Sequence, residues 1–236
     1  MTTERESSQD GLIWCLDKFS LVEVLSDQEQ DELHREMSAG DYRSGTPIYR
    51  VGDPSDTVYK LHYGLVRLTR PSDHGQNLTV AILGPGQIFG ETSLADEPAR
   101  QWIAETLEDS RVCWISKSAL LRFAERNPKL SFRITKLVGD RLTELDNRLS
   151  DVLFLTARGR LARVLLKIGT RFGAPDSSKN RVRLTIALTH QDLAELIGST
   201  RETASTAIGD LRRHSLINTE GDTIALNDVE ALSNIR

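Results

Sequence analysis

The sequence of 236 residues is poor in the features that mark secreted and iron-sulfur proteins. It has two cysteines, Cys15 and Cys113, and aromatic residues make up only 6% of the chain. Two thiols are too few for the four thiolates that an iron-sulfur cluster usually takes, so we expect no such cluster. Because the two cysteines are far apart in the sequence, we expect both to be reduced, buried thiols of a cytoplasmic protein.

Long apolar runs are also missing. No uninterrupted apolar segment approaches the roughly 20 residues that cross a bilayer, and the opening MTTERESSQD is too polar and acidic to begin a secretory signal. We therefore expect a cytoplasmic protein with no membrane partner. The histidines show no paired metal-ligand spacing, and neither a P-loop nor a nucleophile elbow occurs. These absences argue against an enzyme and leave no candidate metal site, although haem held by a single His or Cys stays open.

Composition and charge allow two domains of different character. The hydrophobic content of 39% is enough to give each of two modest domains a core. The net charge of -4 is unevenly distributed, because residues 154–236 hold 12 Lys and Arg against 9 Asp and Glu, a balance of +3, whereas the remainder has a balance of -7. This asymmetry is a weak indication that the C-terminal part contacts nucleic acid, and ordinary surface variation is the alternative.

The segment 188–226 has the pattern of a winged helix-turn-helix. Thr189 is placed to cap a first helix, with Asp192 three positions on as in a capping box. Gly198 permits a tight turn, and Thr200 is placed to cap a second helix. Residues 216–226 then predict two short strands around a glycine turn, which would form the wing. A helix, a turn and a second helix also occur in proteins that do not bind nucleic acid, so the residues on the second helix must decide.

The second helix of the pattern presents polar residues near its amino end. In a helix-turn-helix this end enters the major groove and meets the base edges. Arg201 can bind guanine through two hydrogen bonds, and Glu202 can accept one from a cytosine amino group. We therefore predict Arg201, Glu202 and Ser205 as base-reading residues.

The first half of the chain has the pattern of an antiparallel β-roll. From about residue 42 to 115, short runs rich in β-branched and aromatic residues alternate with glycines, as in VYKLHYG, LVRLTR and LTVAIL. A long helix is predicted next, beginning at Pro128, because apolar residues recur at steps of four and three. These residues are Leu130, Ile134, Val138, Leu142, Leu145, Leu149 and Val152. The stripe either packs against the chain's own β-roll or pairs with a second copy, and we favour a homodimer.

Two sets of motifs resemble one known family, in the family's own order. The phrases GDPSDTVYKLHYGLVRL and LGPGQIFGE, followed by Arg100, resemble the cyclic-nucleotide-binding roll of the cyclic-AMP receptor protein/FNR (CRP/FNR) family of bacterial transcription regulators. The phrases IGSTRET and LRRHSLI resemble its DNA-binding domain. The resemblance implies an α+β fold in three parts. These parts are residues 1–127 with the effector-binding-like β-roll, residues 128–153 forming a long dimerisation helix, and residues 154–236 forming a winged helix-turn-helix.

The resemblance also implies an effector site, from which this sequence departs. In members that bind a cyclic nucleotide, the positions of Gly90 and Glu91 hold the ribose and that of Arg100 neutralises the phosphate. The candidate effector residues are Gly90, Glu91, Arg100, Gln101, Arg141, Leu145 and Asp146. Hydroxyl residues that cyclic-AMP members use are replaced by Gln101, Leu145 and Asp146, which disfavours cyclic AMP. The effector is thus unknown, and a different small molecule or no ligand at all are both open, with Glu91 and Arg100 as a structural ion pair in the second case.

For DNA, the resemblance implies that His190, Thr200 and Thr203 contact phosphate. Thr206 stands where the family usually has an arginine that reads a second guanine, so we expect a palindromic TGTGA-like site that is relaxed or altered at one base pair. The implied partners are double-stranded DNA, a second copy of the chain and, if the protein activates, RNA polymerase, with residues 173–180 as a candidate activating loop or a plain solvated connection. The alternative is a small-molecule-binding module that regulates a protein partner rather than DNA.

Overall fold

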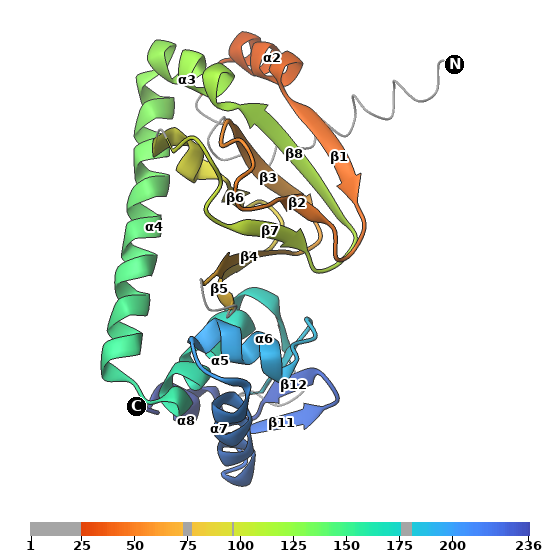
Figure 1. The fold of residues 1–236 in the computed structure, drawn as a ribbon, viewed down its shortest axis with the longest axis vertical. Helices are drawn as coiled ribbons and strands as arrows, with labels where there is room; N and C mark the ends of the chain where they lie inside the picture. The colour runs from red at the N-terminus through yellow and green to blue at the C-terminus, as the bar shows by residue number, and fades with distance from the viewer. Residues whose placement is uncertain (1–24, 73–76, 96, 176–180) are drawn as a thin grey trace. The chain divides into compact units, whose positions relative to one another are not determined.

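The structure is a computed structural model that describes residues 25–72, 77–95, 97–175 and 181–236. The chain forms two compact units, the first made of residues 1–75 and 80–142 and the second of residues 76–79 and 143–236 (Figure 1). The division falls inside the long helix α4 (Pro128–Phe154).

The first unit is built on two four-stranded sheets, with strand orders β1-β8-β3-β6 and β2-β7-β4-β5. The strands are β1 (Ser38–Tyr42), β2 (Pro47–Tyr49), β3 (Thr57–Tyr63), β4 (Val66–Pro71), β5 (Asn77–Leu83), β6 (Ile88–Phe89), β7 (Ile103–Thr106) and β8 (Ser110–Ser116). The pairs β1/β8, β3/β8, β2/β7 and β4/β7 are antiparallel. The predicted antiparallel roll is therefore confirmed. Three further elements are the helices α2 (Asp27–Glu36) and α3 (Lys117–Arg126) and the short 3-10 helix η1 (Glu91–Ala95).

Two apolar clusters fill the roll, and β8 contributes to both because alternate side chains of a strand point to opposite faces. Val112 belongs to the cluster that contains Phe89, while Cys113 and Ile115 belong to the cluster that contains Leu130. The alternation of apolar residues along the strands is thus what places a core on each side of β8.

Cys113 is fully buried on β8 and is disulfide-bonded. The expectation of reduced thiols is therefore wrong for Cys113, and Cys15 lies outside the described residues. Separation along the sequence was a poor guide, because disulfide formation depends on the spatial geometry of the two residues and not on their distance in the chain.

Helix α4 begins at Pro128 as predicted and runs for 27 residues. Its first turns belong to the first unit, because Leu130 is fully buried in the roll and Ile134 and Leu137 pack against the same cluster. Further along, Val138, Leu142, Leu145, Leu149 and Val152 are between 50% and 67% exposed. Leu130 and Ile134 are therefore core residues of the roll, and the apolar stripe left uncovered is shorter than the sequence suggested. None of the helices in the described parts of the chain is long and apolar enough to span a membrane.

The second unit is a winged helix-turn-helix with a larger sheet than expected. Its helices are α5 (Ala157–Phe172), α6 (His190–Ile197), α7 (Arg201–Arg213) and α8 (Val229–Ser233). Its sheet has the order β11-β12-β10-β9, with β9 (Gly173–Pro175), β10 (Val182–Leu184), β11 (Ile217–Glu220) and β12 (Thr223–Leu226). The two helices and the hairpin of the prediction are confirmed, and β9 and β10 were missed. The predicted loop 173–180 begins with β9, and its residues 176–180 lie outside the described residues.

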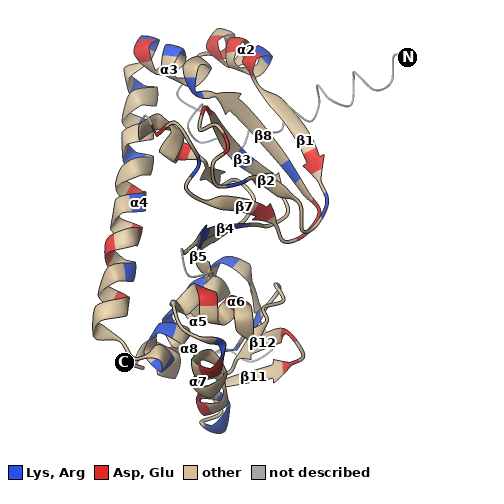
Figure 2. Ribbon diagram, in the orientation of Figure 1, with Lys and Arg blue, Asp and Glu red and all other residues tan. Residues whose placement is uncertain are grey.

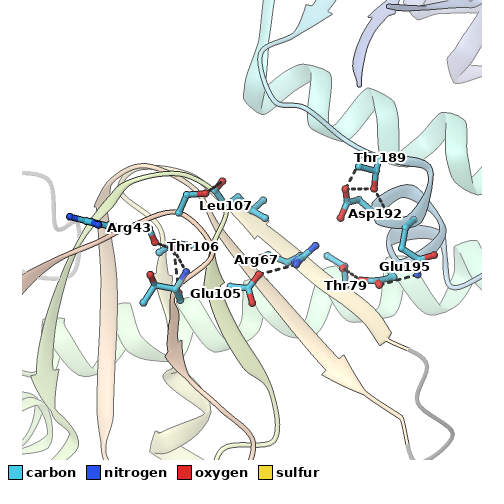
Figure 3. Close-up of polar contacts among 12 residues, drawn as sticks. Arg43, Arg67, Thr79, Glu105, Thr106, Leu107, Thr189, Asp192 and Glu195 are labelled. Atoms are coloured by element: carbon cyan, nitrogen blue, oxygen red, sulfur yellow. Dashed lines mark hydrogen bonds and ion pairs between the residues drawn. The ribbon is translucent and has the colours of Figure 1, made fainter. Parts of the chain in front are cut away.

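Hydrogen bonds from side chains set the start of both helices of the motif. The backbone N–H of Thr189 donates to Asp192 at 2.9 Å, and that of Asp192 donates to the Thr189 hydroxyl at 3.2 Å, which completes the predicted capping box (Figure 3). Gly198 ends α6 in the left-handed conformation with φ 61°. Thr200 then caps α7 by accepting from the Thr203 backbone N–H at 3.3 Å. The turn of the motif is therefore fixed by residues that the sequence identified.

Candidate nucleic-acid interface

Helix α7 is amphipathic, and its exposed face carries the predicted base-reading residues. The buried face consists of Ala204, Ala207, Ile208 and Leu211, and the helix packs against α5 and α6. Arg201 and Glu202 are exposed on the first turn, and Ser205 is half-buried on the second. Because apolar residues hold one side of the helix against the unit, the amino end of the other side is exposed and accessible to a partner.

The Glu202 carboxylate is held in its charged form at the start of α7. A hydrogen bond from its own backbone N–H lowers its pKa, with further contributions from the Thr200 hydroxyl and the positive charge of Arg201. The carboxylate therefore stays an acceptor at neutral pH, which is the form that can pair with a cytosine amino group. Arg201 beside it supplies donors only.

The residues predicted to contact phosphate are all exposed. Thr200 and Thr203 are exposed, and their hydroxyl oxygens are 3.1 Å apart. The imidazole Nδ1 of His190, at the start of α6, lies 2.8 Å from the Ser205 hydroxyl oxygen on α7. This hydrogen bond joins the two helices, so His190 and Ser205 form one polar unit on the surface.

Charge is distributed unevenly between α7 and the wing. The carboxyl end of α7 carries the exposed residues Arg212 and Arg213, whereas the turn between β11 and β12 carries Glu220 and Asp222 (Figure 2). Asp210 balances part of the basic charge, because Arg213 donates to it at 3.0 Å and lowers its pKa. The negatively charged phosphate backbone of a nucleic acid would be attracted to the carboxyl end of α7. It would be repelled by the turn between β11 and β12, which is the wing tip.

In the first unit, Arg100 is bonded to its own chain. It is only 2% exposed, and its guanidinium donates to the carbonyl oxygens of Gly90, at 3.0 Å, and Thr57. The guanidinium carbon also lies 4.5 Å from the ring centroid of Tyr49 and 5.5 Å from that of Tyr59. The arginine that the resemblance assigns to a phosphate is thus engaged by backbone carbonyls and aromatic rings.

Glu91 and Arg141 form a second buried polar contact in the first unit. Arg141 Nε donates to Glu91 Oε1 at 2.9 Å, and its Nη2 donates to the Ile88 carbonyl at 2.9 Å. The other carboxylate oxygen of Glu91 is buried and has no hydrogen-bond partner among the described residues. The expected structural pairing of Glu91 with Arg100 is therefore wrong, because Arg141 on α4 takes that place.

Within the first unit, the structure brings four of the candidate effector residues together. Gly90, Glu91, Arg100 and Arg141 are linked by the hydrogen bonds described above. In contrast, Gln101 is exposed on the segment before β7, and Leu145 and Asp146 are exposed on the second half of α4.

The sequence reading missed the aromatic residues around Arg100. Tyr49, Tyr59 and Phe89 form a cluster with ring centroids 5.2 to 6.2 Å apart. Burial raises the pKa of both tyrosines, so they stay neutral. Their positions on β2 of one sheet and on β3 and β6 of the other gave a signal, since inward-facing aromatic residues of two packed sheets meet in the core.

Comparison with known proteins agrees with this architecture. The family model of the cyclic nucleotide-binding domain matches residues 40–127, and that of the Crp-like helix-turn-helix domain matches residues 159–235. The cyclic AMP receptor protein of Thermus thermophilus is 32% identical over 82% of this chain and 86% of its own. The chain belongs to the CRP/FNR family.

Other relatives extend the comparison. The CRP-like cAMP-activated global transcriptional regulator of Mycobacterium tuberculosis is 29% identical over 85% of this chain and 89% of its own. The solved structure of a CRP/FNR-family transcriptional regulator from T. thermophilus is 27% identical, with a TM-score of 0.69, and the match covers 83% of this chain and 96% of that one. This CRP/FNR protein is accordingly a DNA-binding transcription regulator.

The bonds of Arg100 generate a prediction about stability. Arg100→Met should lower the free energy of unfolding by about 2 kcal/mol or more, because two carbonyls lose a charged donor. Arg122→Met should cost about 1 kcal/mol or less, since it breaks only the exposed pair with Glu36. Denaturant unfolding followed by tryptophan fluorescence measures both. An Arg100 variant as stable as the wild type would mean that this arginine does not stabilise the roll and is instead available to bind a ligand.

Proposed function

We propose that this CRP/FNR protein is a homodimer that reads a palindromic, TGTGA-like DNA site through α7. The observation that carries the proposal is the exposed amino end of α7, where Arg201 and Glu202 stand beside the threonine cap. Arg201 would bind guanine and Glu202 would accept from cytosine. His190, Thr200 and Thr203 would contact phosphate and position the unit without specifying sequence. Ser205, whose hydroxyl contacts His190, would be the third base-reading residue.

The second copy is expected on α4. The exposed residues Val138, Leu142, Leu145, Leu149 and Val152 recur at steps of four and three, which is the spacing of a two-stranded coiled coil. Exposure of an apolar stripe of this size to water is unfavourable, and pairing with the identical stripe of a second copy removes it from solvent. A two-fold dimer would also present two copies of α7 to half-sites about one helical turn apart.

For the β-roll, the bonds of Arg100 support the ligand-independent form of the proposal. An anion would have to displace two backbone carbonyls from the guanidinium, and their buried oxygens would lose their partner. One observation favours the second candidate, an effector other than cyclic AMP. The unpaired buried oxygen of Glu91 is an acceptor that a ligand with a hydroxyl or amino group would satisfy.

A regulator of this kind would act in the cytoplasm, and as an activator it would contact RNA polymerase. The alternative function, docking to a protein through the C-terminal helices, fits the surface less well. The exposed face of α7 is charged and polar, whereas helix-docking faces are usually apolar. Gel-shift assays with genomic fragments decide between them, since the alternative predicts no shifted fragment.

The first prediction of the proposal concerns base reading. Arg201→Ala should weaken binding to the preferred palindrome by about tenfold or more, because one bidentate contact per half-site is lost. Binding to random DNA, which depends on salt-sensitive phosphate contacts, should change little. Fluorescence anisotropy at two salt concentrations measures both quantities. Arg163→Ala, on the exposed side of α5, is the matched control, and an equal loss on random DNA would contradict the assignment.

The second prediction concerns the dimer. Leu142→Glu combined with Leu149→Glu should give a monomer, because four carboxylates would meet in the apolar seam. The control is Lys136→Glu combined with Asn147→Glu, which places two carboxylates on the opposite side of the same helix and should leave the dimer intact. Sedimentation velocity measures the mass. A double variant in the stripe that stays dimeric would exclude α4 as the interface.

The third prediction concerns the effector. The affinity for the palindrome should be the same with and without cyclic AMP, cyclic GMP or cyclic di-GMP, because Arg100 is already bonded within the roll. Titration of labelled DNA in the presence of each nucleotide measures this. A tightening of tenfold or more with any of them would refute the ligand-independent form and leave the DNA-reading proposal in place.

A further inference from the structure

Thr206 lies on α7, one turn after Glu202, and is exposed. Its hydroxyl donates a hydrogen bond to the backbone carbonyl of Glu202 at 2.9 Å. A threonine hydroxyl has one hydrogen, so its only donor is used within the helix. What the side chain can offer to a partner is a methyl group and an oxygen lone pair.

The surroundings of Thr206 leave that methyl group accessible. Gly209, three residues further along α7, has no side chain, and a Cβ placed there would meet nothing within 4 Å. The Glu202 carboxylate is exposed one turn before Thr206, and its pKa is lowered by its own backbone N–H and the Thr200 hydroxyl. Thr206 is therefore exposed beside a position that carries no side chain.

The chemistry of the base edges then selects a partner. In the major groove guanine presents only acceptors, N7 and O6, which require a donor that Thr206 has already committed. Thymine is the base that presents a methyl group there, and apolar contact with a threonine methyl is one of the ways in which proteins recognise it. We propose that Thr206 reads a thymine methyl group, so that a T·A pair stands in each half-site at the position facing this residue.

This inference rests on the proposed function, since it assumes that α7 enters the major groove. It deepens that function by assigning a specificity-determining residue to the position where an arginine is usual in the family. Reading a guanine there would need the hydroxyl to release the Glu202 carbonyl, and a single hydroxyl would still give one hydrogen bond where an arginine gives two.

The experiment removes one methyl group at a time from the DNA. In the preferred palindrome, each thymine of the half-site is replaced in turn by uracil, which differs from thymine only by the missing methyl group. Wild-type protein should lose roughly fivefold to tenfold in affinity at one thymine position, which is the low end of what a single wrong pair costs in such sites. Replacing that pair by G·C should weaken binding by at least as much.

Variants then tie the effect to Thr206. Thr206→Ser keeps the hydroxyl and removes the methyl, so the difference between thymine and uracil should disappear at that position. Thr206→Val keeps the methyl and should retain the difference. Thr203→Ser, which makes the same chemical change at a residue expected to contact phosphate, is the matched control and should leave the difference unchanged.

The outcomes separate this inference from the proposed function. If no palindrome is preferred over scrambled DNA, the proposed function fails and the inference fails with it. If a palindrome is preferred and Arg201 is required, but every uracil substitution is neutral or the site prefers G·C opposite Thr206, only the inference is overturned. A uracil effect that persists in Thr206→Ser would assign the methyl contact to another residue and would also overturn it.

Discussion

The hydrogen bonds at the turn between α6 and α7 are the constraint on which the function depends. Gly198 takes the left-handed conformation that ends α6, and Thr200 immediately caps the next helix. Because the cap fixes where α7 begins, it also fixes which residues occupy the first turn. Arg201 and Glu202 are exposed at the helix end for this reason, while the next residues inward on the other face are buried alanines. A shift of one residue in the cap would rotate the reading face by about 100°.

The β-roll illustrates the opposite case, in which a buried polar group depends on contacts that are distant in the sequence. Arg100 donates to the carbonyls of Gly90 and Thr57 and contacts the ring of Tyr49, while its Nε has no hydrogen-bond partner among the described residues. Buried charges are tolerated when they are hydrogen-bonded in this way. The arginine thereby joins β3 to the segment after β6, which makes it a structural residue of the roll. One buried oxygen of Glu91 has no hydrogen-bond partner among the described residues, so it is a hydrogen-bond acceptor that the roll leaves unused.

The sequence predicted what local signals determine. The capping box at Thr189, the glycine turn and the start of α4 at Pro128 depend on neighbouring residues, and each was found where expected. The strands β9 and β10 were missed because they have three residues each and exist through pairing with one another and with β12. A three-residue segment has too little pattern to show its secondary structure.

The candidate DNA-reading residues and the candidate effector residues differ in the same way, because local spacing determines the first and the folded sheet determines the second. The exposure of Arg201 and Glu202 could be predicted, because helical spacing separates the two faces of α7. The bonds of Arg100 could not, since Thr57 lies 43 residues away and only the folded sheet brings it close. The burial of Leu130 was hidden for a similar reason, because one apolar stripe in the sequence serves both the roll and the outer face of α4.

Charge and contact number together explain why pairing would matter for this regulator. The wing tip is acidic and Thr206 lacks the positive charge of an arginine, so one copy of α7 offers few strong contacts to DNA. At about 1 to 3 kcal/mol for each good base contact, a single half-site gives modest discrimination over random sequence. Two-fold repetition doubles the number of base contacts without any new residue, and the second binding event becomes intramolecular. Specificity would therefore depend on the apolar stripe of α4 as strongly as on the reading residues themselves.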